Sequence, residues 1–132
     1  MRPRRPAQSF RFWSLVAALV TLVVTGVTAV DQSKREVTVV GRKYTYDVTD
    51  ASGPVIRVRL DDLVTVNFSV SDIAHSFTVS DDHYRIDKRA EPGKPVTISF
   101  RASDVGEFEI RCTLSIDARC AKEMRGRLIV TK

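Results

Sequence analysis

Hydrophobic and polar side chains alternate with a period of two along most of the chain after residue 35. Turn residues separate these runs, as in "ASGP" at 51–54 and "EPGK" at 91–94. Such alternation is typical of strands that bury one face, and it predicts about eight short strands. The expected strands cover residues 35–41, 42–48, 55–60, 64–70, 75–79, 95–100, 106–112 and 124–130.

No amphipathic helical pattern of comparable length follows residue 35. Many short strands at this spacing indicate an all-β domain, a Greek-key β-sandwich or barrel. The fold class predicted from the pattern alone is therefore all-β.

Three chemically distinctive side chains lie at the ends of expected strands. Because side chains two residues apart share a face, Cys112 continues the buried face of the strand 106–112. Met124 begins the buried face of the last strand, and His75 begins that of the strand 75–79. If the two last strands pair antiparallel, Cys112 and Met124 share one pole of the domain, and the turn "SDIA" would bring His75 to the same pole.

An uncharged segment precedes the domain. Residues 12–30 carry no charge and follow the basic residues 1–11, and nineteen helical residues reach about 28 Å, close to a hydrocarbon core of about 30 Å. This segment is expected to be a transmembrane anchor or the hydrophobic region of a signal peptide. The basic flank would then stay in the cytoplasm and the domain, 36–132 behind a tether at 31–35, would be extracytoplasmic, that is periplasmic.

The net charge of +5 says little about partners. Four arginines in the first eleven residues account for most of it, and 17 basic and 16 acidic side chains remain in the rest of the chain. The basic character therefore reflects membrane topology, and nucleic acid is not an expected partner.

The chain resembles the cupredoxins, and among them the dinuclear copper (Cu-A) domain of cytochrome c oxidase subunit II. The resemblance covers residues 36–132 and rests on "HSF" at 75–77, "EPGKPVTISFRASDVGEFEIRC" at 91–112 and "MRGRLIV" at 124–130. In that family a histidine opens a strand, a Gly-aromatic strand delivers a cysteine, and a ligand loop ends in methionine. The resemblance implies copper, electron transport and a β-sandwich carried on a membrane segment.

The ligand loop departs from the family pattern. The Cu-A loop runs Cys-x3-Cys-x3-His-x2-Met, whereas this chain has Cys112-x7-Cys120-x3-Met124. Counting back from Met124, the place of the loop histidine is Ala121. The bridging cysteines of a dinuclear centre require the short spacing, so a single copper ion is expected rather than two.

The metal ligands expected from these arguments are His75, Cys112, Cys120 and Met124, because imidazole with soft sulfur favours copper. Each residue has a plainer alternative. The two cysteines are the only ones in the chain and in an oxidising compartment they can form a disulfide. Met124 can be a core methionine and His75 a buried structural histidine. His83 and the acidic residues of the turns are expected at the surface.

Two functions follow from these alternatives. In the first, the protein is a membrane-anchored copper-binding cupredoxin that transfers electrons or handles Cu(I), with a redox or copper-delivery protein as its partner. In the second, it is a metal-free binding or structural module stapled by a Cys112–Cys120 disulfide. An enzyme is not expected, because copper oxidases need several sites, although a place as accessory subunit of a respiratory oxidase stays open.

Overall fold

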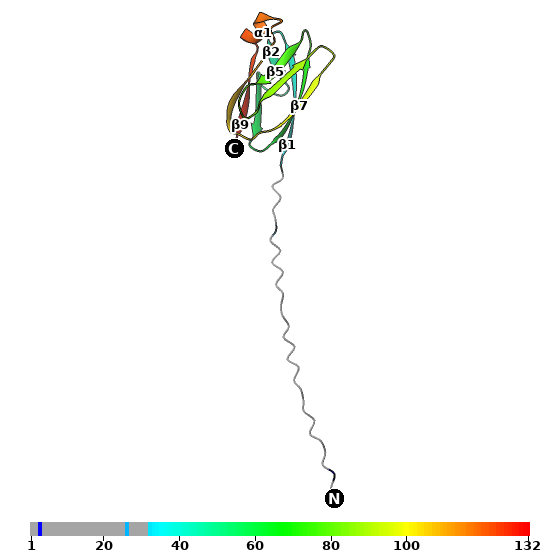
Figure 1. Ribbon diagram of the computed structural model, residues 1–132, viewed down its shortest axis with the longest axis vertical. Helices are drawn as coiled ribbons and strands as arrows, with labels where there is room; N and C mark the ends of the chain where they lie inside the picture. Colours follow the sequence, from blue (N-terminus) through cyan, green and yellow to red (C-terminus); the bar gives the residue numbers. More distant parts are fainter. Residues whose placement is uncertain (1–2, 4–25, 27–31) are drawn as a thin grey trace.

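Two β-sheets pack face to face in the computed structural model, which describes Pro3, Gly26 and residues 32–132 (Figure 1). A four-stranded sheet has the order β2-β1-β4-β7, and a five-stranded sheet has the order β3-β9-β8-β5-β6. The elements are β1 (Lys34–Arg42), β2 (Thr45–Val48), β3 (Val55–Arg59), β4 (Leu63–Val70), β5 (His75–Val79), β6 (Ile86–Ala90), β7 (Val96–Arg101), β8 (Gly106–Arg111), α1 (Ala118–Glu123) and β9 (Arg125–Thr131).

The predicted alternation is confirmed by burial. In β4, every second side chain from Val64 to Val70 faces the interior and is buried. An aromatic cluster lies at the centre, where the ring of Phe68 stands 5.7 Å from that of Phe77 and 6.1 Å from that of Tyr46. Offset and edge contacts of this kind add to the hydrophobic burial. The expected all-β sandwich is thus the observed fold.

Two elements differ from the expectation. Strand β6 was not predicted because its sequence, "IDKRA", has three exposed polar residues in a row between buried ends. The six-residue helix α1 lies between the cysteine-bearing loop and β9, and six residues are too few to show a helical period. Strand β1 begins at Lys34, inside the segment expected to be a tether.

The paths of the strands bring three segments to one end of the sandwich. Strands β8 and β9 pair antiparallel, with Arg111 opposite Arg125, so the end of β8 lies beside the start of β9. Strand β4 ends at Val70, opposite Gly41, and the next turn leads into β5. Helix α1 covers this end, and the first residues of β1 lie at the other (Figure 1).

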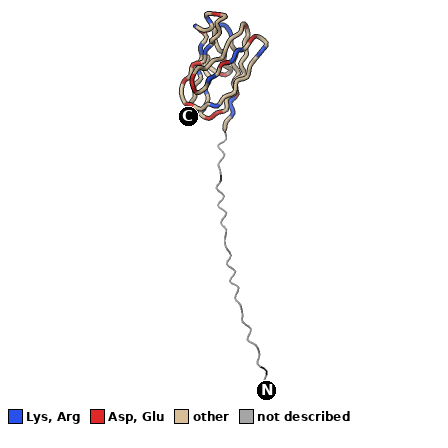
Figure 2. Tube along the Cα trace, viewed as in Figure 1, with Lys and Arg blue, Asp and Glu red and all other residues tan. Residues whose placement is uncertain are grey.

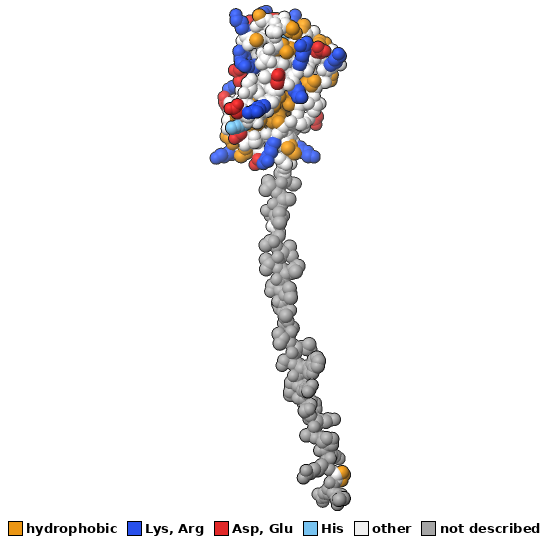
Figure 3. All heavy atoms as spheres, in the orientation of Figure 1, with side chains coloured by type: hydrophobic (Ala, Val, Ile, Leu, Met, Phe, Trp, Pro, Cys, Tyr) orange, Lys and Arg blue, Asp and Glu red, His pale blue; other side chains and the backbone are white. Residues whose placement is uncertain are grey.

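Charges of both signs are interspersed over the domain surface (Figures 2 and 3). Some of them form ion pairs between neighbouring strands, such as Arg125 of β9 with Glu109 of β8. This distribution agrees with the near balance of charge after residue 11. The expected membrane or signal segment at 12–30 lies outside the described residues apart from Gly26, and the described residues include no helix with the length and hydropathy of a membrane span.

Candidate metal centre

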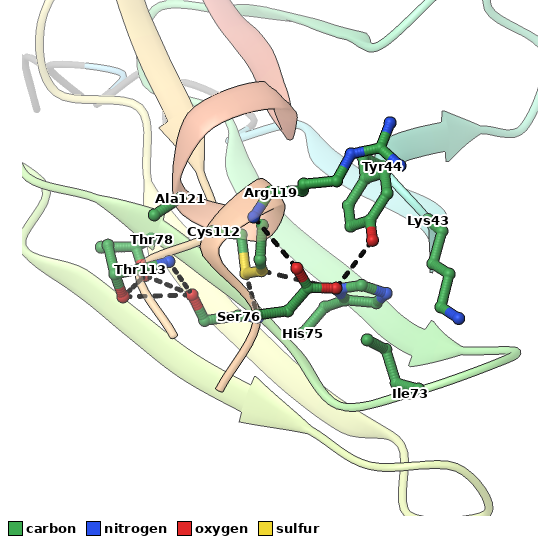
Figure 4. The surroundings of a disulfide bond; sticks show 12 residues. Lys43, Tyr44, Ile73, His75, Ser76, Thr78, Cys112, Thr113, Arg119 and Ala121 are labelled. Atoms are coloured by element: carbon green, nitrogen blue, oxygen red, sulfur yellow. Dashed lines mark hydrogen bonds between the residues drawn. A yellow bond between two sulfur atoms is a disulfide. The ribbon is translucent and has the colours of Figure 1, made fainter. Parts of the chain in front are cut away.

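His75, Cys112 and Cys120 meet at the end of the sandwich that α1 covers. Their ligand atoms all lie within 4.8 Å of one another, and all three residues are buried. The two cysteines form a disulfide, with 5.4 Å between their Cα atoms, and Figure 4 shows the imidazole ring beside the two sulfur atoms. The predicted common pole of His75 and Cys112 is therefore observed.

Backbone contacts from two neighbouring strands fix Cys112. Its N–H donates to the carbonyl oxygen of Met124 at 3.3 Å, which continues the pairing of β8 with β9. From the other side, the N–H of Ser76 donates to the sulfur of Cys112 at 3.5 Å. Cys112 is thus held by a backbone hydrogen bond that extends the β8–β9 pairing, and its sulfur accepts one hydrogen bond.

Side-chain contacts at the start of α1 fix Cys120. Asp117 caps the helix, where its carboxylate accepts a hydrogen bond from the N–H of Arg119 at 3.0 Å. The hydroxyl of Tyr44 donates to the other oxygen of this carboxylate at 2.7 Å. The guanidinium of Arg119 lies 4.3 Å from the centre of the Tyr44 ring, as expected for a cation–π contact. The turn after β1 therefore holds the short helix that carries Cys120.

Asp72 holds the opposite side of the His75 ring. The Nε2 atom of His75 lies 2.9 Å from Oδ1 of Asp72. The same oxygen accepts the N–H of Ile73 at 2.6 Å, and Oδ2 accepts the N–H of Lys43 at 2.6 Å. Desolvation raises the pKa of Asp72, but these hydrogen bonds outweigh it and hold the pKa below its usual value. Asp72 is therefore an ionised carboxylate at neutral pH.

The carboxylate of Asp72 limits the role of the nearer ring nitrogen of His75. A carboxylate only accepts hydrogen bonds, so Nε2 must donate to it and Nδ1 keeps a lone pair. Nδ1 lies 3.6 Å from the sulfur of Cys120. A disulfide sulfur carries no hydrogen, so a lone pair on Nδ1 would face the sulfurs of the oxidised protein without a donor. A buried acceptor without a donor is costly. This cost favours a second state of the protein in which Nδ1 has a hydrogen donor or a metal ion as its partner.

Two chemical species can become the partner of Nδ1 once the disulfide is reduced. The thiol of Cys120 can donate its hydrogen to Nδ1, or a metal ion can sit between the nitrogen and the two thiolates. Two thiolates and one imidazole are the soft donor set that Cu(I) prefers, and the Asp72 carboxylate behind the ring is the outer-shell partner that metal-bound histidines usually have. The residues present therefore fit a copper ion in the reduced state.

Met124 lies next to this cluster but its methyl group points into the core. The residue is fully buried between α1 and β9. A Cβ placed on Gly41 would come within 3.2 Å of the Met124 Cε atom and 3.1 Å of the Phe68 ring. Met124 thus packs against Gly41, and its expected role as a copper ligand stays a prediction.

The other sequence candidates lie elsewhere. His83 is half exposed and sits 3.2 Å from the carboxylate of Asp104, on the loop between β5 and β6, so it does not supply the missing imidazole. The acidic residues of the turns were expected at the surface, and for Asp62 this expectation is wrong. Asp62 is buried and accepts hydrogen bonds from Ser33 and the N–H of Arg59.

The sequence reasoning missed Asp72 and Tyr44. The stretch "SDIA" indicates a turn, and the only sequence signal for the role of Asp72 is its position three residues before His75. Tyr44 offers no such signal, because only the fold brings the turn between β1 and β2 beside α1.

No protein-family model and no curated protein sequence matches the chain. Solved structures do resemble it. A heme-copper terminal oxidase dimer contains a chain that matches with a TM-score of 0.65 and 17% identity, over 76% of this chain and 65% of that one. The periplasmic domain of cytochrome oxidase subunit II from Bradyrhizobium japonicum matches with a TM-score of 0.63 and 15% identity, over 74% and 84% of the two chains.

A third match is a mixed-disulfide complex between a thioredoxin-like protein and subunit II of cytochrome c oxidase, with a TM-score of 0.59 and 15% identity over 74% of this chain and 82% of that one. At these identities the matches establish the fold. This chain spans about two thirds of the length of the matched terminal-oxidase chain. The described domain is a cupredoxin-like β-sandwich, close in fold to the copper-bearing domain of cytochrome oxidase subunit II.

Proposed function

We propose that this protein binds a single copper ion through His75, Cys112 and Cys120 when its disulfide is reduced. The observation that carries the proposal is the buried cluster of the His75 imidazole and the two cysteine sulfurs, whose ligand atoms lie within 4.8 Å of one another. These three residues are the only such group of metal-binding histidine, cysteine and acidic side chains among residues 32–132.

Copper held there would supply a one-electron couple or, kept as Cu(I), would be a cargo for delivery. Two thiolates favour Cu(I), and the absence of a loop histidine removes the second imidazole that the resembled copper centres use. We therefore favour the storage or delivery of Cu(I) over electron transfer as the function. The protein would serve as a copper-handling or accessory subunit beside a respiratory oxidase, and no catalytic role is assigned to it.

The proposal needs a reductant for the Cys112–Cys120 disulfide. Opening it takes two electrons and two protons, and a partner dithiol supplies both as it becomes a disulfide itself. A thioredoxin-like protein is a partner of this chemical class, and one forms a mixed disulfide with the subunit II of similar fold. Both cysteines are buried, so the loop that carries α1 must open for the exchange.

An extracytoplasmic location, on the outer side of the cytoplasmic membrane, suits this chemistry. Disulfides persist in oxidising compartments, and the matched subunit II domain is periplasmic. The uncharged segment 12–30 behind a basic flank would anchor the domain there.

Copper titration of the full chain tests the proposal. The protein is prepared reduced or oxidised, and Cu(I) affinity is measured anaerobically by competition with a colorimetric chelator. We expect one copper ion per reduced chain and none per oxidised chain. Cys120→Ala should weaken binding under reducing conditions. Absence of binding by the reduced wild type would reject the proposal.

A metal-free module is the second candidate. The disulfide in the structure and Ala121 at the place of the loop histidine favour it. In that case reduction would lower stability and copper would not restore it. Cys120→Ala would then have the same stability as the reduced wild type, with or without copper.

A further inference from the structure

We infer that Asp72 is a positioning residue that fixes the ring orientation and tautomer of His75. The inference concerns how the site works, and its copper-binding consequence rests on the proposed function. The contact is made on the Nε2 side of the ring, away from the sulfurs, so Asp72 acts on the metal site only through His75.

Asp72 is itself held in place by the backbone. Its two oxygens accept the N–H groups of Ile73 and Lys43, each at 2.6 Å. Lys43 belongs to the turn after β1, whereas Ile73 lies in the loop before β5. The carboxylate is therefore anchored to two separate segments before it meets the histidine ring. An acceptor held this way cannot rotate to follow the ring, so the ring must orient towards it.

The alternative tautomer of His75, with its proton on Nδ1, would be unfavourable. If Nδ1 carried the only proton, the lone pair of Nε2 would face the carboxylate of Asp72 at 2.9 Å, and two acceptors would meet without a hydrogen. The Nε2–H form is thus selected by the carboxylate, and it leaves Nδ1 free towards Cys120. Partners of this kind also raise the basicity of the imidazole and commonly change metal affinity about 10- to 100-fold when removed.

Substitutions at position 72 separate orientation from packing. Asp72→Ala removes the acceptor. Asp72→Asn keeps one carbonyl oxygen, which is expected on the side of Ile73 and His75, where two donors converge. Asp62→Ala is the matched control, because Asp62 also accepts hydrogen bonds from a backbone N–H and a side-chain hydroxyl. Asp62 lies in the turn between β3 and β4, at the end of the sandwich opposite to His75.

The first measurement is the nitrogen NMR spectrum of the His75 ring in the metal-free, oxidised chain. We expect a protonated, slowly exchanging Nε2–H and an unprotonated Nδ1 in the wild type, in Asp72→Asn and in Asp62→Ala. In Asp72→Ala the Nε2–H signal should be lost to solvent exchange. A wild-type ring protonated at Nδ1, or an unchanged signal in Asp72→Ala, would overturn the inference.

The second measurement is Cu(I) affinity of the reduced variants. Asp72→Ala should bind about 10- to 100-fold more weakly than the wild type, Asp72→Asn should lose less, and Asp62→Ala should bind as the wild type does. If the reduced wild type binds no copper, the proposed function fails, while the NMR spectra still decide the role of Asp72. Equal affinity of Asp72→Ala and wild type would show that Asp72 does not position a ligand.

Discussion

The hydroxyl of Tyr44 donates a hydrogen bond to the carboxylate of Asp117, 73 residues later in the chain. Since Asp117 caps α1, this contact links the turn after β1 to the helix that carries Cys120. It raises the pKa of Tyr44 and lowers that of Asp117, as expected when a phenol donates to an ionised carboxylate.

Tyr44→Phe should therefore loosen α1 without disturbing the sandwich. The amide of Cys120 donates to the carbonyl of Asp117, so we expect its hydrogen exchange to become faster in the variant. Exchange in β8 should not change. The control is Tyr84→Phe, which loses hydrogen bonds to the backbone of Asp104 far from the helix. Equal protection of Cys120 in wild type and Tyr44→Phe would show that the cap alone holds the helix.

Reduction of the disulfide should destabilise the protein, and copper should reverse the loss. Closing a loop with a sequence separation of 8 residues contributes roughly 2–3 kcal/mol in the chain-entropy model. Cu(I) at a free concentration of about 100 times its dissociation constant would restore about 2.7 kcal/mol. Urea unfolding of oxidised, reduced and copper-loaded protein measures both effects. Reduced protein that gains no stability from copper would favour the metal-free module.

Met124→Leu tests whether the thioether is a ligand. The two side chains have similar volume, so the swap should cost less than about 1.5 kcal/mol in unfolding free energy. We expect weaker Cu(I) binding by the reduced variant, because the change removes the only soft donor at this position. Unchanged affinity together with unchanged stability would assign Met124 to the core, where its methyl group packs against Gly41.

Asp62 should make stability depend on pH in the acid range. Hydrogen bonds from Ser33 and from the N–H of Arg59 lower its pKa. A carboxyl group with a lowered pKa in the folded state contributes stability above its unfolded pKa of about 4 and loses it as the pH falls further. Thermal unfolding of the wild type and of Asp62→Asn is measured between pH 2 and 7, in steps of about half a pH unit. The variant should lose less stability than the wild type as the pH falls. Parallel curves would exclude this carboxylate as a source of the pH dependence.

Much of the fold follows from the alternation of side chains. The inward positions of β4, from Val64 to Val70, and those of β5 are legible in the sequence because each strand has one face in the core. Strand parity places Cys112 and His75 at strand ends, and they share one pole on the condition that the last two strands pair antiparallel and that the turn before His75 lies there. The structure shows both the antiparallel pair and the shared end. Strand β6 escapes the argument since its middle residues face solvent on a sheet edge.

The state of the site could not be predicted in the same way. Two cysteines with a sequence separation of 8 residues serve equally as a disulfide or as a ligand pair, and only their sulfur positions show the bond. The tautomer of His75 depends on Asp72, whose orientation is set by the N–H of Lys43 from another hairpin. Such contacts between segments distant in sequence leave no periodic trace in the chain.

The chain enters the sandwich at the end opposite to the cluster of His75, Cys112 and Cys120, and this separation would set how a partner of the proposed site approaches. The chain enters the sandwich at Lys34, and β4, eight residues long, separates that end from His75, a height of about 26 Å at the usual rise of a strand. If residues 12–30 anchored the entry point in a membrane and the strands stood upright on it, the cysteines would lie well above the lipid headgroups. The donor or acceptor would then be a freely diffusing protein or the tall outer part of a larger complex, since a partner confined to the bilayer plane would not reach them.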